Sequence, residues 1–237
     1  MLDVLWESQE SLFPLLKSLP EGVWDDGGCT VSEQTTRVSS SLSCSISKSF
    51  KRPPTTLEWA RFRKYPQRMR GLIGYDLGKL HSLLSALQLH AINEPLFPNL
   101  GNLRLCPIGR KLAPFISLFL SPRTTVIDIT FDESLPKLMV ALTIATLPTL
   151  CPNLQKILLF SLPRDPMITA AVSGMLLASN RNALRSVRVD SPLTEEAHEV
   201  ICKLSDLREL MVVIERGTSL PLGGASESHQ PIYQIQL

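Results

Sequence analysis

One spacing of apolar residues recurs along the chain and constrains its fold more than any other feature. An apolar side chain stands at positions i, i+3 and i+5, and the clearest copy is Leu154, Ile157 and Leu159. Copies begin at residues 69, 100, 124, 154, 184 and 207, so the steps between them are 31, 24, 30, 30 and 23 residues. A period of this size indicates one structural unit that is repeated along the chain.

The repeated spacing identifies the kind of unit. It is L-x-x-L-x-L, the signature of leucine-rich repeats, whose usual period is about 20–29 residues. Two copies are imperfect, with Gly74 in the third place of one and Thr124 in the first place of another. Pro98-Asn99 precedes one copy as Pro152-Asn153 precedes another. We therefore predict an α/β leucine-rich-repeat solenoid, in which a curved parallel sheet carries helices on its convex side. Irregular α/β architecture without a solenoid is the alternative.

Strands and helices are expected to alternate within the solenoid. Strands are predicted at residues 69–73, 101–106, 125–130, 155–160, 185–189 and 208–214. Helices are predicted from the threonine caps at residues 55 and 56 to the proline at 66, and over residues 77–87, 111–120, 134–146, 166–179 and 194–203. Because one such unit cannot bury its apolar face alone, the units must stack on one another.

The repeat divides the chain into four segments. Residues 1–25 are predicted to form an amphipathic helix that caps the open end of the solenoid, and a helix that docks into a partner's groove is the alternative. Residues 26–50 are rich in serine and are predicted to contain a loop and a possible strand near residues 41–48. The solenoid follows over residues 51–216, and residues 217–237 are expected to be a disordered tail.

Charge, cysteine content and hydropathy favour a soluble protein of the cytoplasm or nucleus. The formal net charge of +2 is too small to indicate a nucleic acid or an acidic membrane by itself. The 5 cysteines include no C-x-x-C pair and predict free thiols in a reducing compartment. The start of the chain lacks a signal-peptide pattern, and the longest apolar run, residues 138–150, is shorter than the roughly 18–20 residues that cross a bilayer.

Residues suited to catalysis do not stand in a recognisable pattern. The 4 histidines have no metal-like or triad-like context, and for His198 beside Glu195 a solvated polar face is favoured over a ligand set. Gly71, Gly74 and Gly78 are spaced wrongly for a phosphate cradle, and we interpret them as turn residues. We therefore predict a non-catalytic protein that needs no cofactor and no metal.

The residues between the apolar strand positions are predicted to face the concave side of the sheet, where repeat proteins usually bind their partners. They mix both charges with a few apolar side chains, which is typical of a protein-binding surface. Ordinary solvent-facing strand residues are the alternative. The predicted partner-binding residues are Asn102, Arg104, Asp128, Lys156, Phe160, Arg188, Asp190 and Glu209.

A basic segment, residues 48–70, offers a second kind of site. Its charges are interrupted by one acid, Glu58, and Phe62 and Tyr65 are interleaved with them. Such a segment could bind RNA or another polyanion through phosphate contacts and base stacking. The alternative is a solvated helix face whose aromatic side chains point inward. The basic residues proposed for this site are Lys51, Arg52, Arg61, Arg63, Lys64, Arg68 and Arg70.

Four stretches carry a resemblance to a known family. Residues 2–20, 50–54, 59–62 and 69–72 resemble the repeat region of fungal F-box leucine-rich-repeat proteins, and the repeats as far as Val213 fit the same family. In that family an N-terminal F-box binds the adaptor of a cullin-type ubiquitin ligase, while the repeats hold the substrate. The resemblance thus implies the substrate-receptor half of such a protein.

The resemblance also limits what can be assigned to this chain. The family's F-box would precede Leu2, so no residue of this chain is assigned a contact with the ligase adaptor. We expect the chain to correspond to a truncated or shortened member of the family. The adaptor is expected as a partner only if an F-box is encoded upstream, whereas the concave face is expected to bind a protein whose identity the sequence does not give.

Overall fold

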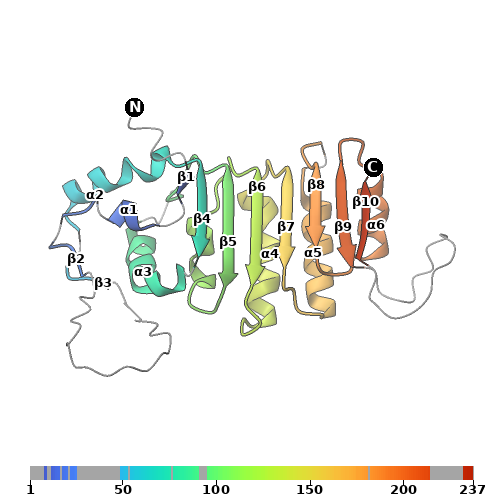
Figure 1. The fold of residues 1–237 in the computed structure, drawn as a ribbon, viewed down its shortest axis with the longest axis horizontal. Coiled ribbons are helices and arrows are strands. Elements are labelled where there is room, and N and C mark those ends of the chain that lie inside the picture. The colour runs from blue at the N-terminus through green and yellow to red at the C-terminus, as the bar shows by residue number, and fades with distance from the viewer. Residues whose placement is uncertain are drawn as a thin grey trace, which may run out of the picture.

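The computed structural model shows one large sheet with helices packed on one of its faces (Figure 1). It describes residues 8–9, 12–16, 18–20, 22–25, 49–52, 54–75, 77–90, 95–180, 182–213 and 232–236. Within these residues the large sheet has 8 strands, of which the last in the chain is antiparallel to its neighbour and the others are parallel. The α/β class and the parallel sheet that the sequence predicts are confirmed.

The strands of the large sheet lie side by side in chain order. The order is β1 (Ser8–Gln9), β4 (Gly71–Tyr75), β5 (Asn102–Ile108), β6 (Val126–Phe131), β7 (Lys156–Phe160), β8 (Ser186–Val189), β9 (Glu209–Val213) and β10 (Ile232–Gln236). A second sheet pairs β2 (Trp24–Asp25) with β3 (Ser49–Phe50). Since parallel crossovers are almost always right-handed, strands that always advance in one direction place their connecting helices on the same face.

The helices of the described residues are α1 (Phe13–Leu16), α2 (Thr56–Arg63), η2 (Pro66–Arg68), η3 (Leu77–Leu80), α3 (His81–His90), η4 (Ala113–Leu118), α4 (Lys137–Leu150), α5 (Pro166–Ala178) and α6 (Glu195–Cys202), the η elements being 3-10 helices. Of these, α4, α5 and α6 follow this rule. Helix α5 packs against both α4 and α6, and Figure 1 shows these three helices behind the strands. The opposite face of the sheet is called the open face below.

The connection between β5 and β6 differs from the predicted helix over residues 111–120. It is the 3-10 helix η4, with Pro114 in its first turn. A 3-10 helix rises about 2.0 Å per residue against 1.5 Å in an α-helix, so it covers the same distance with fewer residues. This repeat unit has 24 residues, but the unit of 23 residues that begins at Leu184 holds the α-helix α6, so length alone does not select the 3-10 form.

Both ends of the chain carry structure that the sequence analysis did not predict. Within residues 1–25 the described parts are β1, the short helix α1 and β2, and the strand predicted at residues 41–48 lies outside the described residues. In the expected tail, residues 217–237, the five residues of β10 pair along the whole of β9, which differs from the predicted disorder. The Ile-Tyr-Gln-Ile-Gln sequence of β10 has high strand propensity, and that signal was available in the sequence.

The repeated apolar positions line up across the sheet. The second place of every repeat pairs in register with the second place of the next, and the third places do the same. The second-place row is Leu72, Leu103, Ile127, Ile157, Val187 and Leu210, and the third-place row is Gly74, Leu105, Ile129, Leu159, Val189 and Val212. Apart from Gly74, which has no side chain, all these residues are at most 4% exposed. The core therefore consists of continuous rows that run from unit to unit, against the helices.

A ladder of backbone hydrogen bonds fixes where each strand begins. The carbonyl oxygen of Arg70 accepts from the N–H groups of Gly101 and Asn102, at 2.8 and 3.0 Å. The carbonyl of Gly101 accepts in the same way from the next unit, through Thr125 and Val126 at 2.8 and 3.0 Å. The carbonyls of residues 125, 155 and 185 continue the series. Each unit is thereby held in register by the unit before it.

Asparagine side chains repeat a further contact between units. The Asn99 side-chain amide donates to the Gln67 carbonyl at 2.6 Å, and the Asn153 amide donates to the Pro122 carbonyl at 2.9 Å. Both asparagines stand directly before the first apolar place of their repeat. The recurrence of Pro-Asn in the sequence therefore corresponds to a recurring structural contact.

The two imperfect copies keep the core filled in different ways. Thr124 is 0% exposed, and its hydroxyl donates to the Leu100 carbonyl at 3.0 Å, so that its polar group is satisfied. At Gly74, a Cβ would lie 2.5 Å from Cδ1 of Leu77 and 2.8 Å from Cδ2 of Leu105. Leu77 therefore fills the space of the missing side chain. The interpretation of Gly71, Gly74 and Gly78 as turn residues is wrong, since the first two lie in β4 and the third in η3.

Substitution of Gly74 tests this account of the missing side chain. Gly74→Ala is expected to lower the free energy of unfolding by about 1–3 kcal/mol, because the Leu77 and Leu105 side chains must move. Gly174→Ala in α5 is the matched control: nothing lies within 4 Å of its added Cβ, and the substitution should stabilise the helix by up to about 1 kcal/mol. Urea unfolding followed by circular dichroism measures both. Effects of the same sign would contradict the assignment.

Two neighbouring residues of β7 test which face of the sheet is the core. Ile157→Ala should cost about 2–5 kcal/mol, because its side chain is 0% exposed in the second-place row. Leu158→Ala removes a half-buried side chain from the open face and should cost roughly half as much or less. The same unfolding measurement distinguishes them, and equal losses would show that both faces of the strand are buried.

Candidate functional site

The open face is the candidate functional site, because none of α4, α5 and α6 covers it (Figure 1). Its side chains alternate along each strand with those of the buried rows and also pair in register. One row is Gly71, Asn102, Val126, Lys156, Ser186 and Glu209, and the next is Ile73, Arg104, Asp128, Leu158, Arg188 and Met211. The predicted partner-binding residues of the strands therefore lie on one surface.

Arg104 and Asp128 form an ion pair across two neighbouring strands. They are register partners on β5 and β6, and Arg104 Nε lies 3.0 Å from Asp128 Oδ2. The arginine side chain is 55% exposed and the aspartate side chain 20%. The carboxylate therefore holds a guanidinium that remains largely open to solvent.

A second ion pair crosses from β8 to β9. Arg188 Nε donates to Glu209 Oε1 at 2.7 Å, and the Nη2 atom of Arg188 contacts the same oxygen. The Ser186 hydroxyl donates to the other carboxylate oxygen of Glu209 at 2.9 Å. The hydrogen bond from Arg188, followed by the one from Ser186, lowers the pKa of Glu209 below its usual range. Glu209 is therefore held ionised and oriented by its neighbours.

Asp190 accepts hydrogen bonds from the backbone of its own chain. Its carboxylate accepts from the backbone N–H of Leu162 at 3.0 Å and from that of Ser161, whose φ of 57° lies in the left-handed region. Burial raises the pKa of Asp190, and the hydrogen bonds oppose this rise. The structure thus places Asp190 at the turn that follows β7, where it fixes the backbone. Phe160, at the end of the same strand, is half-buried and pairs in register with Thr130.

A depression of about 490 Å³ lies on the open face where β4, β5 and β6 begin. It brings together three of the predicted partner-binding residues, Asn102, Arg104 and Asp128, with Arg70 of the basic segment. The remaining lining residues are Ser8, Gly71, Leu72, Ile73, Leu103 and Val126. The other predicted residues, Lys156, Phe160, Arg188, Asp190 and Glu209, do not line it.

Arg70 is a candidate of the basic segment that also lines the depression on the open face. It was grouped with the basic segment because of its neighbours in the sequence, whereas the structure places it beside β5 through the hydrogen bonds of its carbonyl to Gly101 and Asn102. The available signal was its position directly after Met69, the first place of a repeat.

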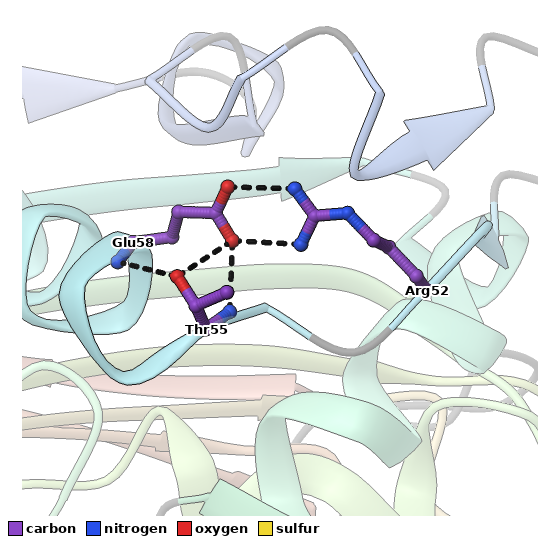
Figure 2. A network of polar contacts seen from close by, with 3 residues as sticks. All are labelled: Arg52, Thr55 and Glu58. Carbon is purple, nitrogen blue, oxygen red and sulfur yellow. Dashed lines mark hydrogen bonds and ion pairs between the residues drawn. The ribbon is translucent and has the colours of Figure 1, made fainter.

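The basic segment is engaged in part with its own chain. Arg52 forms two hydrogen bonds to the Glu58 carboxylate, at 2.7 and 2.8 Å (Figure 2). Glu58 also accepts from the Thr55 N–H at 2.8 Å, while its own N–H donates to the Thr55 hydroxyl at 3.3 Å. This is a capping box at the start of α2, and it confirms the predicted cap. Arg52 therefore binds the glutamate of the capping box at the start of α2.

The aromatic residues of the basic segment point into the protein. Phe62 is 1% exposed and stacks on Trp59, with ring centroids 5.2 Å apart. Tyr65 packs against the core. Of the basic residues, Lys51, Arg63 and Arg68 have interactions within the protein. Lys51, Arg61, Lys64 and Arg68 are exposed. Phe62 is therefore not available to stack against a nucleic-acid base.

The outer face of α4 and α5 is the other exposed surface of note. Leu138, Leu142 and Met167 are 59%, 57% and 47% exposed. Apart from Lys137, the two helices carry no charged side chain. This surface lacks the charged groups with which the open face could select a partner, so the open face is the stronger candidate.

Cysteine and histidine side chains do not form a site in the described part of the chain. The described cysteines, Cys106, Cys151 and Cys202, are free thiols. His198 lies beside Cys202 on α6, with its ring nitrogens 3.8 and 3.9 Å from Sγ. Among the described residues no group of three or more histidine, cysteine or acidic side chains is placed to hold a metal ion. No described helix has the length and apolar character needed to cross a membrane.

The acidity of Glu58 tests the capping geometry. The Arg52 guanidinium and the Thr55 N–H lower the pKa of Glu58 from 4.5 to about 2. Because the pKa is lower in the folded state, ionised Glu58 stabilises the fold above about pH 4.5, and this stabilisation is lost as the pH falls toward 2. NMR titration of the Glu58 side chain should give a midpoint near 2. Arg52→Ala should raise that midpoint, and Lys64→Ala, which removes an exposed charge nearby, should not.

Comparison of the chain with protein-family models, curated proteins and solved structures finds no match. Similarity therefore assigns no family, and the resemblance to F-box leucine-rich-repeat proteins stays a prediction. The function must be argued from the geometry of the open face.

Proposed function

We propose that the chain is a non-catalytic binding module that holds another protein on the open face of its parallel sheet. The observation that carries this proposal is the depression of about 490 Å³, lined by Arg70, Asn102, Arg104 and Asp128 on a face that α4–α6 leave uncovered. A hollow with convergent polar groups on a rigid sheet is suited to fixing the position of a partner.

We also propose that the units are leucine-rich repeats. Three recurring features support this: the in-register apolar rows, the carbonyl ladder at the strand starts and the contacts of Asn99 and Asn153 with the preceding unit. The apolar rows and the carbonyl ladder repeat from unit to unit, and the asparagine contact occurs in two units. In such proteins the sheet face opposite the helices is the usual binding surface.

The size of the open face favours a macromolecule. Strands β4 to β9 are six neighbours about 4.8 Å apart, which gives a width of about 24 Å, and five residues at about 3.3 Å each give a height of about 17 Å. The product is roughly 400 Å², about half of what one partner buries in a standard protein interface. This area suits a peptide segment or the loop of a protein.

The composition of the face supports the same conclusion. Half-buried apolar side chains, Leu158, Phe160 and Met211, lie among the ion pairs of Arg104 and Arg188. Apolar side chains surrounded by polar groups are typical of protein interfaces. By its resemblance, the chain would be the substrate-receptor part of an F-box protein of the cytoplasm or nucleus. The ubiquitin-ligase adaptor would be a partner only if an F-box is encoded upstream.

Binding of RNA or another polyanion through the basic segment is the second candidate. It is disfavoured because Arg52 is paired with Glu58 and Phe62 is buried. The two candidates predict different surfaces, which allows one experiment to separate them.

Site-specific photo-crosslinking provides that experiment. A photoreactive amino acid is placed at Leu158 on the open face, at Arg61 in the basic segment or at Leu142 on the outer helix face, and each full chain is irradiated in an extract of its source cells. We expect a discrete protein adduct from position 158 alone, resistant to nuclease. Adducts from position 61 that disappear with nuclease would instead establish the polyanion candidate, and adducts of equal pattern from 158 and 142 would contradict open-face binding.

A further inference from the structure

The start of the sheet carries an excess of positive charge. The residues that immediately precede the strands, and whose carbonyls or N–H groups form the backbone ladder, include exposed arginines before β4, β8 and β9. The six residues at these positions are Arg70, Gly101, Thr125, Gln155, Arg185 and Arg208. None of them is acidic. Among the described residues of the turn before β9, Asp206 is an exposed acid and stands two residues before Arg208.

The acids of the open face are already bound to arginines. Asp128 is paired with Arg104, and Glu209 with Arg188. Lys156 lies between the uncharged residues Val126 and Ser186 in register. After the two ion pairs cancel, the excess charge at this side of the face is positive. A partner that is complementary in charge to this face would therefore be acidic.

Part of this positive charge lies in the depression. Arg70 and Arg104 line it together, with the amide side chain of Asn102 between the two strand starts. Arg104 is held by Asp128 at its Nε atom, while a guanidinium carries five N–H donors, so donors remain for a second oxyanion. Ile73 and Val126 supply apolar lining. Two arginines and an amide that converge in a hollow can bind a carboxylate.

We propose that the depression binds an aspartate or glutamate side chain of an extended acidic segment in the partner protein, an inference that rests on the proposed function. The carboxylate accepts hydrogen bonds from Arg70 and Arg104. From β5 the segment continues across the sheet to β7, where Lys156 receives a second acid. Two strand spacings of about 4.8 Å lie between the lengths of two and four residues of extended chain. Since side chains of an extended chain alternate between its two faces, the two acids are two or four residues apart.

A displayed library of random 12-residue peptides, selected on the full-length chain, is the probe. We expect the selected peptides to contain two acids that are two or four residues apart. For a synthetic selected peptide, Arg104→Gln and Arg70→Gln should each weaken binding about tenfold, as the loss of a charged hydrogen bond does. Lys111→Gln removes a positive charge from an exposed side chain outside the depression and outside the basic segment, and it should leave the affinity unchanged. Circular dichroism confirms that each variant is folded.

The outcomes separate this inference from the proposed function. Peptides without acids that lose affinity with Leu158→Ala but not with Arg104→Gln would overturn the acidic-segment inference and leave open-face binding in place. Selected peptides that are insensitive to Leu158→Ala, Arg70→Gln and Arg104→Gln, or a library that yields no binder, would overturn both. A single-stranded oligouridine RNA that binds the depression more tightly than the peptides, with the same Arg104 dependence, would also overturn the inference.

Discussion

The carbonyl ladder at the strand starts is the constraint on which the rest of the structure depends. Each carbonyl accepts from two successive N–H groups of the following unit, as at Arg70 with Gly101 and Asn102. This fixes the register of every parallel pair, and a slip by one residue would move the buried row to the opposite face. The apolar rows and the open-face rows are both consequences of that register, so the core and the candidate site have one origin.

The register of the parallel strands also explains which parts of the structure could be predicted from the sequence. Strand positions and the buried rows follow from local spacing, because i+3 and i+5 residues such as Ile157 and Leu159 share one face of a strand. The alternating residues Arg104, Asp128 and Arg188 could be assigned to the other face for the same reason. The predicted helix cap at Thr55 was also a local signal, and the structure shows its hydrogen bond.

The parts that could not be predicted depend on contacts between distant residues. Arg52 precedes α2 and pairs with Glu58, six residues later, so the helical period does not indicate their pairing. Asp190 contacts the backbone of Leu162, 28 residues earlier. The sequence does not indicate this contact, so Asp190 was predicted to be an open-face residue. The depression follows from the placement of Arg70 beside β5, which only the ladder between units determines.

The open-face ion pairs are better explained by positioning than by stability. Exposed pairs such as Arg104–Asp128 contribute only about 0–1 kcal/mol to folding, because solvent screens them and two side chains lose freedom. The same loss of freedom is useful in binding, where ordering a long side chain costs about 0.5–1.5 kcal/mol. A guanidinium that Asp128 already holds avoids part of this cost when it meets a partner's carboxylate. Since each pair joins neighbouring strands, the register that builds the core also orients the arginines of the site.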